Sequence, residues 1–293
     1  MLPKEILKKI RRIEIKTSRM VTDVFAGQYH SVFKGQGMEF EEVREYLPGD
    51  EIRSIDWNVT ARMGHPFVKK FVEERQLTVM LLMDVSGSNY FGSGAQLKSE
   101  VAAELCSVLA FSAIKNNDRV GLLIFSDRIE AFIPPRKGTR HVLRVIREAL
   151  YARPAGRTTD IQLALEYLNA VQRKKAVCFL LSDFWGCEYS RQLRVANKRH
   201  DMIAVTITDP REQELPAGGI VLMEDGETGA PLVVDTGSPA IRAAFQQHSR
   251  MRLDERAETL RQAGIDTVDI KTDVPYSAAL YRFFRMRERR IRR

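Results

Sequence analysis

The chain has 293 residues, of which 44% are hydrophobic and 29% charged, fractions that are ordinary for a globular protein with a large core. No apolar run reaches about 18 residues, and the charged N-terminus lacks the apolar segment of a signal peptide, so we expect neither a membrane span nor export. The net charge of +8 is uneven, since residues 1–19 carry +5 and residues 280–293 carry +6, which leaves −3 for residues 20–279. This distribution argues against a dedicated nucleic-acid-binding protein, and no specific nucleic acid partner is expected.

The three cysteines, Cys106, Cys178 and Cys187, are odd in number and widely spaced. They match neither a disulfide framework nor the paired spacing of a zinc site. Cys106 and Cys178 lie in apolar stretches, where we expect buried thiols. Reduced cysteines favour a cytoplasmic location.

Residues 1–75 predict a small N-terminal layer that contains a helix and strands. An amphipathic period marks the first helix, and rough alternation of apolar and polar residues marks the first strand. Asp50 follows a Pro-Gly turn and is placed to cap a short helix. The predicted elements are a helix over 3–19, a glycine-containing loop over 31–38, a strand over 39–46, a short helix over 52–57 and a strand over 67–72.

From residue 77 onward, apolar segments alternate with helical periods. Such alternation predicts an α/β domain with a doubly wound, mostly parallel sheet flanked by helices, and we place this domain over residues 76–275. The predicted strands are 77–83, 119–125, 129–133, 176–181, 202–207 and 268–270, with a hairpin over 220–234. The predicted helices are 97–115, 140–151, 161–171, 189–198 and 241–263.

Residues 276–293 predict a basic C-terminal helix or tail. Leu280, Phe283 and Phe284 are spaced to form an apolar face that docks on the sheet or on the N-terminal helix. Six arginines follow within residues 285–293, and like charges at helical spacing cost about 0.2–0.5 kcal/mol per pair, so the last turns are predicted to fray unless an anion screens them. One interpretation is a solubilising tail, and the other is peripheral contact with an anionic surface such as acidic lipid, nucleic acid or an acidic partner.

The strand over 77–83 is predicted to lie at the centre of the sheet because it is apolar on both faces. It ends in Asp84-Val-Ser-Gly-Ser88, at the edge where open α/β sheets form their sites. A carboxylate and two hydroxyls are hard oxygen ligands, which suit Mg²⁺ or Mn²⁺ better than zinc. The alternative is that Asp84 caps the next helix and that Ser86 and Ser88 are turn residues.

Familiar catalytic motifs do not fit this loop. A phosphate-binding loop requires Lys-Ser/Thr where Ser93-Gly94 stands. A nucleophile elbow requires glycine at the position of Asp84. The five histidines are scattered and provide no obvious base. We therefore do not expect an enzyme.

The segment Asp84-Val-Ser-Gly-Ser88 resembles the metal-ion-dependent adhesion site of von Willebrand factor type A domains. Such a site also uses a threonine before a helix with an Ala-Leu pair, and an aspartate at the end of the next buried strand. Thr159 has the better spacing to that pair, with Thr158 as the alternative. Asp183 lies just after the strand over 176–181. Considered separately, Thr158 or Thr159 would be interpreted as a helix N-cap, and Asp183 as an acidic residue of a loop. The resemblance implies a von Willebrand factor type A-like fold and a cation held by Asp84, Ser86, Ser88, Thr159 and Asp183.

A longer segment, from Tyr46 through Leu-Pro-Gly-Asp to Arg62, resembles the signature of the bacterial domain-of-unknown-function 58 family, and the resemblance covers nearly the whole chain. It implies a cytoplasmic partner of a MoxR-type AAA+ ATPase. Within this signature four residues are either functional or form an internal ion-pair and aromatic cluster, and we favour the cluster. These four residues are Arg53, Asp56, Trp57 and Arg62.

The expected function follows from an incomplete coordination shell. Mg²⁺ requires six oxygens, and the predicted ligands leave one position that an Asp or Glu of a partner would fill. We therefore expect a metal-dependent protein-interaction module that acts in protein assembly or remodelling with a MoxR-type ATPase or another protein that offers an acidic ligand residue. The alternatives are a metal-dependent hydrolase and a binder of nucleic acid or membrane through the basic termini. The sequence does not determine the oligomeric state.

Overall fold

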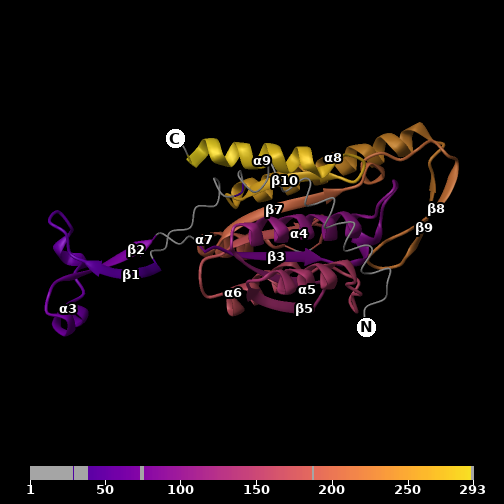
Figure 1. Ribbon diagram of the computed structural model, residues 1–293. Coiled ribbons are helices and arrows are strands. Elements are labelled where there is room, and N and C mark those ends of the chain that lie inside the picture. The colour runs from indigo at the N-terminus through magenta and orange to yellow at the C-terminus, as the bar shows by residue number, and fades with distance from the viewer. Residues whose placement is uncertain (1–28, 30–38, 73–75, 187, 292–293) are drawn as a thin grey trace. The chain divides into compact units, whose positions relative to one another are not determined.

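The computed structural model describes residue 29 and residues 39–72, 76–186 and 188–291 (Figure 1). Its contacts divide the chain into two compact units, of which Phe33–Leu77 is the smaller, and residues 78–293 belong to the larger. The predicted helix over 3–19 and loop over 31–38 lie outside the described residues. No helix in the described ranges is long and apolar enough to cross a membrane.

The smaller unit is an antiparallel strand pair with a short helix between its strands. Strands β1 (Glu39–Glu45) and β2 (Phe67–Val72) form where strands were expected and pair with each other, and helix α3 (Trp57–Met63) lies between them in the sequence. The predicted helix over 52–57 is wrong, because Ile52–Ser54 form only a single 3-10 turn and α3 begins at Trp57.

Asp50 and Asp56 explain where that helix begins. The carboxylate of Asp50 accepts hydrogen bonds from Arg44 and from the Leu47 amide, so Asp50 holds the turn and does not cap a helix. Asp56 is extended and accepts from the amides of Asn58 and Val59, which makes it the N-cap of α3.

Two of the signature residues, Asp56 and Trp57, have defined surroundings within the smaller unit. Asp56 lies 3.4 Å from the ammonium of Lys69, which is an ion pair within the smaller unit. Trp57 is 67% exposed and makes no aromatic pair with another described residue of the smaller unit, and the predicted cluster stays a prediction.

The larger unit is built on a six-stranded sheet in the order β10-β7-β6-β3-β4-β5. All neighbouring strands are parallel except β4 and β5, which form an antiparallel hairpin at one edge. This sheet confirms the predicted doubly wound α/β class, with the apolar strand after residue 77 in an interior position. The strands are β3 (Thr78–Asp84), β4 (Arg119–Phe125), β5 (Ile129–Arg136), β6 (Val177–Ser182), β7 (Asp201–Thr208) and β10 (Asp266–Lys271).

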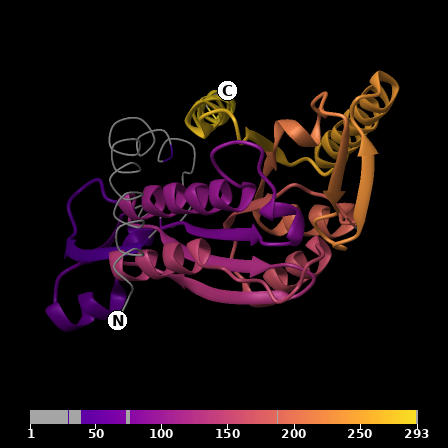
Figure 2. The same cartoon turned by 90° about the vertical axis from the view of Figure 1, so that its right-hand side faces the viewer.

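Helices cover both faces of this sheet (Figure 2). Helix α4 packs beside α5, and α6 packs beside α7. The helices are α4 (Lys98–Lys115), α5 (Thr139–Leu150), α6 (Ile161–Val171), α7 (Ser190–Arg199), α8 (Pro239–Gln262) and α9 (Tyr276–Ile291). A two-stranded ribbon of β8 (Ile220–Glu224) and β9 (Pro231–Asp235) interrupts the alternation between β7 and α8.

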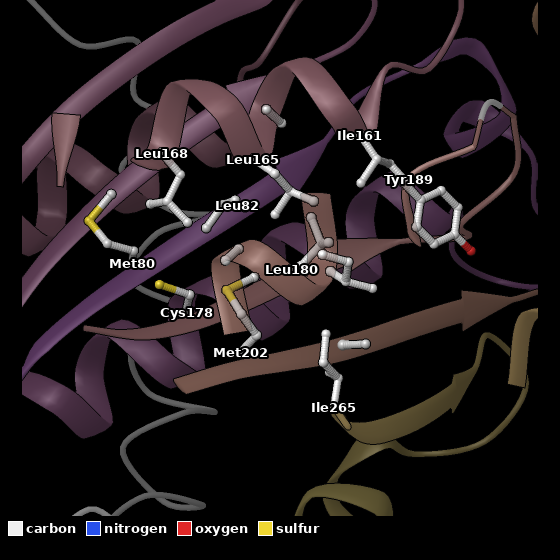
Figure 3. Close-up of a cluster of buried hydrophobic side chains, with 14 of the residues drawn as sticks. Met80, Leu82, Ile161, Leu165, Leu168, Cys178, Leu180, Tyr189, Met202 and Ile265 are labelled. Atoms are coloured by element: carbon white, nitrogen blue, oxygen red, sulfur yellow. The ribbon is translucent and has the colours of Figure 1, made fainter. Parts of the chain in front are cut away.

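The core is formed by alternate residues of the strands, as Figure 3 shows for one layer. Met80 and Leu82 of β3 pack in the same cluster as Cys178 and Leu180 of β6, because successive strand residues point to opposite faces. Both of these strands are buried on both faces, which explains why the sequence shows apolar runs and not alternation. Cys106 and Cys178 are buried free thiols, as predicted.

The C-terminal helix α9 includes the turns that were predicted to fray unless an anion screens their charge. Leu280, Phe283 and Phe284 are buried, as expected for its apolar face. The helix nevertheless continues to Ile291. Arg287 explains this, because its guanidinium binds Asp201 of β7 and Asp266 of β10 and its charge is thereby balanced. Arg290 also binds Asp266.

Candidate metal centre

The candidate site lies where the order of the sheet reverses. Strand β3 is followed along the chain by β4 on one side, whereas its other neighbour, β6, comes later. In open α/β sheets such a switch point leaves a crevice at the carboxyl ends of the strands. Asp84 ends β3 and Asp183 immediately follows β6, so parallel pairing brings these two acids to the same edge.

Asp84 is wholly buried and its two carboxylate oxygens are held in place. One accepts a hydrogen bond from the Ser86 amide at 2.9 Å, and the other accepts from the Ser182 hydroxyl at 2.6 Å. The pKa of Asp84 is raised to about 7, chiefly by burial and also by the nearby charge of Asp183, against the opposing effect of the Ser182 hydrogen bond. The edge of the sheet therefore holds negative charge that a bound cation would stabilise.

The loop after Asp84 brings Ser86 and Ser88 together. Their hydroxyl oxygens lie 3.2 Å apart, and the amide of Gly87 donates to the carbonyl of Arg157 at 2.7 Å. Asp84 does not cap the next helix, because Ser86 is the N-cap of the 3-10 turn Gly87–Tyr90 and Leu97 that of α4; Ser86 and Ser88 do lie at this turn, as the alternative proposed. The loop is thus tied to the segment that carries Thr159.

The two candidate threonines differ in burial. Thr159 is buried, whereas Thr158 is exposed. Asp160 caps α6 by accepting from the Leu163 amide at 2.8 Å, so the N-cap interpretation of the threonine is not observed. The Thr159 hydroxyl instead donates to Glu227 at 2.8 Å.

Asp183 is bound by a lysine that the sequence analysis did not identify. The ammonium of Lys98 lies 2.8 Å from one Asp183 oxygen and 2.5 Å from Glu212, and the second Asp183 oxygen accepts from the Trp185 amide. Burial alone would lower the pKa of Lys98, but the carboxylates of Asp183 and Glu212 hold it above its ordinary value. Because the Lys98 ammonium is paired with Asp183 and would repel a second positive charge at that oxygen, this residue would reach a cation through water.

Glu227 is the other residue that the sequence analysis missed. Burial and the neighbouring charge of Asp183 raise its pKa, although the Thr159 hydrogen bond acts in the opposite direction. The acidic turn Glu224-Asp-Gly-Glu227 was the available signal, but Glu227 lies 44 positions beyond Asp183 and nothing in its spacing connects it to the motif. Lys98 gave no signal, because a lysine at a helix start is ordinarily solvated.

The donor set fits a hard divalent cation. The described residues include no three His, Cys, Asp or Glu side chains grouped to hold a metal, so hydroxyl and water oxygens would have to complete any shell. Neighbouring ligand oxygens of octahedral Mg²⁺ lie about 2.9 Å apart, given metal–oxygen distances of about 2.0–2.1 Å. The separation of 3.2 Å between the Ser86 and Ser88 hydroxyls is close to this value.

The fold and the site together define a class: a doubly wound α/β domain with a DxSxS loop at its switch point. A model for the family "Protein of unknown function DUF58" matches residues 42–255, and the chain belongs to this family. An uncharacterized protein of Mycobacterium tuberculosis is 31% identical over 284 residues, which covers 96% of this chain and 89% of that protein.

Solved structures with related folds are more distant. BatB from Bacteroides thetaiotaomicron matches 73% of this chain and 99% of its own at 14% identity, with a TM-score of 0.46. The SpRpn10 VWA domain matches 70% of this chain and 94% of its own at 12% identity, with a TM-score of 0.38. Both similarities are weak, so the fold class rests on the sheet topology of this chain.

Proposed function

We propose that the chain is a metal-dependent protein-interaction module that binds one Mg²⁺ or Mn²⁺ at the DxSxS loop. Asp84, Ser86, Ser88 and Thr159 would supply oxygens directly, and Asp183 would act through water. The observation that carries the proposal is the buried Asp84 carboxylate, which is ordered by Ser86 and Ser182 but lies beside the negative charge of Asp183. An uncompensated buried carboxylate is costly, and a cation would remove that cost.

The proposed binding mode is a contact between the cation and an acidic residue of another protein. A shell made mostly of neutral hydroxyls leaves the cation with much of its charge, so an external Asp or Glu would gain a charge-assisted contact. The family resemblance suggests a MoxR-type AAA+ ATPase as the partner, a role in protein assembly or remodelling, and a cytoplasmic location. No catalytic step is assigned to the site.

Titration calorimetry with Mn²⁺ and Mg²⁺ tests the proposal. Asp84→Asn keeps the size of the side chain and its acceptor for the Ser86 amide but removes the charge, so metal binding is expected to be lost. In chelator the variant should unfold at the same temperature as the wild type or higher, because a buried charge has been removed. Exposed Asp273 provides the control, and Asp273→Asn should bind metal as the wild type does. Equal affinity in Asp84→Asn and wild type would refute the metal site.

A capture experiment tests the interaction. Immobilised wild-type protein should retain a MoxR-type ATPase from the same cell in Mg²⁺, and both chelator and Asp84→Asn should abolish retention. Retention that persists in chelator would mean that the partner binds elsewhere.

The basic face of α9 supports a second candidate, binding to an anionic surface. Arg282, Arg285 and Arg289 are exposed on this helix, whereas Arg287 is only 15% exposed and Arg290 is paired. Fewer arginines are therefore available than the sequence implies. Retention on anionic vesicles that falls steeply with salt, in the absence of divalent metal, would favour this candidate.

A further inference from the structure

The β8–β9 ribbon lies beside the edge of the sheet at which β3 ends, in both Figure 1 and Figure 2. Its connecting turn is well organised. Asp225 accepts hydrogen bonds from the Glu227 and Thr228 amides and from the Thr228 hydroxyl, at 3.1, 2.7 and 2.9 Å. The turn is thus a defined structure that presents Glu227.

The backbone of this turn packs directly against the loop that carries Ser86 and Ser88. A Cβ atom at Gly87 would lie 1.9 Å from the carbonyl oxygen of Gly226, and one at Gly226 would lie 3.1 Å from the Cα of Ser88. Two glycines therefore face each other, and a side chain at Gly87 has no room there. This close approach is what places Glu227 over the site.

The carboxylate of Glu227 lies close enough to Thr159, a predicted metal ligand, for both residues to bind one cation. Its oxygen is 2.8 Å from the Thr159 hydroxyl. Two oxygens that share an octahedral Mg²⁺ at neighbouring positions lie about 2.9 Å apart. Glu227 is thus at the separation expected of a carboxylate that binds the same cation as Thr159.

We propose that Glu227 is an internal ligand of the site, occupying the coordination position that an acidic residue of a partner would take. The β8–β9 ribbon then has to leave the site before a partner binds. This inference rests on the proposed metal-dependent function and adds its regulation: the chain competes with its partner by means of its own glutamate.

The ribbon has a surface suited to such movement. Ile220, Leu222, Leu232 and Val233 are each more than 60% exposed, so these side chains form little packing that would have to be broken. The hydrogen bond from Thr159 and the contact between Gly226 and Gly87 are then the main attachments of the turn to the site among the described residues.

Bound Mn²⁺ provides the probe. Electron paramagnetic resonance measures its affinity, and water-proton relaxation counts its fast-exchanging waters. In Glu227→Ala, Mn²⁺ is expected to bind about tenfold more weakly and to carry one more exchangeable water than in the wild type. Acetate should then displace this water at a lower concentration than the wild type requires. Exposed Glu224 lies on the same ribbon, and Glu224→Ala is the matched control, expected to resemble the wild type in all three measurements.

Gly226→Val tests the seating of the turn without removing any carboxylate. The added side chain should push the turn from the loop and give the extra water of Glu227→Ala. Thermal unfolding in chelator confirms that each variant is folded.

These experiments distinguish failure of the proposed metal site from failure of the proposed internal ligand. If Asp84→Asn binds Mn²⁺ as tightly as the wild type, the metal site itself is wrong. If Asp84→Asn loses Mn²⁺ but folded Glu227→Ala matches the wild type in affinity and water number, the metal site stands and the internal ligand is overturned.

Discussion

Lys98 is the residue on which the charge balance of the site depends. Its side chain is fully buried between Asp183 and Glu212, which come from the segments after β6 and β7. A buried ion pair is weak support for stability as a whole, but removing one partner leaves an uncompensated charge. Lys98 therefore fixes the position of the Asp183 carboxylate at the edge of the sheet.

Replacement of Lys98 by methionine should destabilise the protein by about 3–5 kcal/mol, because Asp183 and Glu212 would remain buried without a cation. Urea unfolding in chelator measures the loss. Lys174→Met, at an exposed position, should change stability by no more than about 0.5 kcal/mol. Adding Glu212→Gln to Lys98→Met should recover part of the loss. A Lys98→Met variant as stable as the wild type would show that the pair contributes little.

At the scale of the element, helix α9 shows how tertiary pairing changes the behaviour of a basic segment. Its apolar residues dock as their spacing predicts, and its arginines are divided between two environments. Arg287 reaches Asp201 and Asp266 at the edge of the sheet, whereas Arg282, Arg285 and Arg289 remain exposed. The helix is thus attached to β7 and β10 at its basic end as well as through its apolar face.

Arg287→Ala should destabilise the protein by about 1–3 kcal/mol, because it removes charge-assisted hydrogen bonds to two carboxylates that are partly buried. The loss is measured by denaturant unfolding. Hydrogen exchange should also show faster exchange in the last turns of α9. The comparison is Arg289→Ala, an exposed arginine on the same helix, which should be nearly neutral. Equal stabilities of the two variants would contradict the structural role of Arg287.

At the scale of the whole molecule, His200 links stability to pH. It lies where α7 ends and β7 begins, it is 2% exposed, and neither ring nitrogen has a hydrogen-bond partner among the described residues. Burial lowers its pKa to about 4, with a smaller effect from the charge of Arg199. The neutral ring is therefore the form that the fold accommodates.

The sign of the pH dependence follows from the lowered pKa. Between about pH 6.5 and pH 4 the unfolded chain binds a proton at this histidine that the folded chain does not, so stability is complete above about pH 6.5 and decreases as the pH falls. The contribution is about 2–3 kcal/mol across that window. His200→Leu should narrow the difference in unfolding free energy between pH 7 and pH 4.5 by this amount, whereas exposed His248→Leu should not. An unchanged difference in His200→Leu would mean that the ring is protonated within the fold.

The pattern of apolar and polar residues along the chain determined much of the fold of this protein. The apolar runs of β3 and β6 predict their buried positions because no polar group is tolerated on either face of an interior parallel strand. The ends of those strands then place Asp84 and Asp183 at one edge, which is why the central part of the candidate site was predictable without coordinates. The helix over 52–57 was mispredicted because Asp50 and Asp56 are equally good caps in sequence, and only the contacts of Asp50 with Arg44 and Leu47 distinguish them.

Tertiary structure alone decided which distant side chains share the site. Lys98, Glu212 and Glu227 enter from a helix, a short turn and a ribbon whose positions depend on packing across the sheet, and no spacing rule relates them to Asp84. The same holds for Arg287, whose partners Asp201 and Asp266 lie 86 and 21 positions away. Sequence pattern encodes which face of an element is apolar, whereas the pairing of charges between elements is set by where the folded chain brings their ends together.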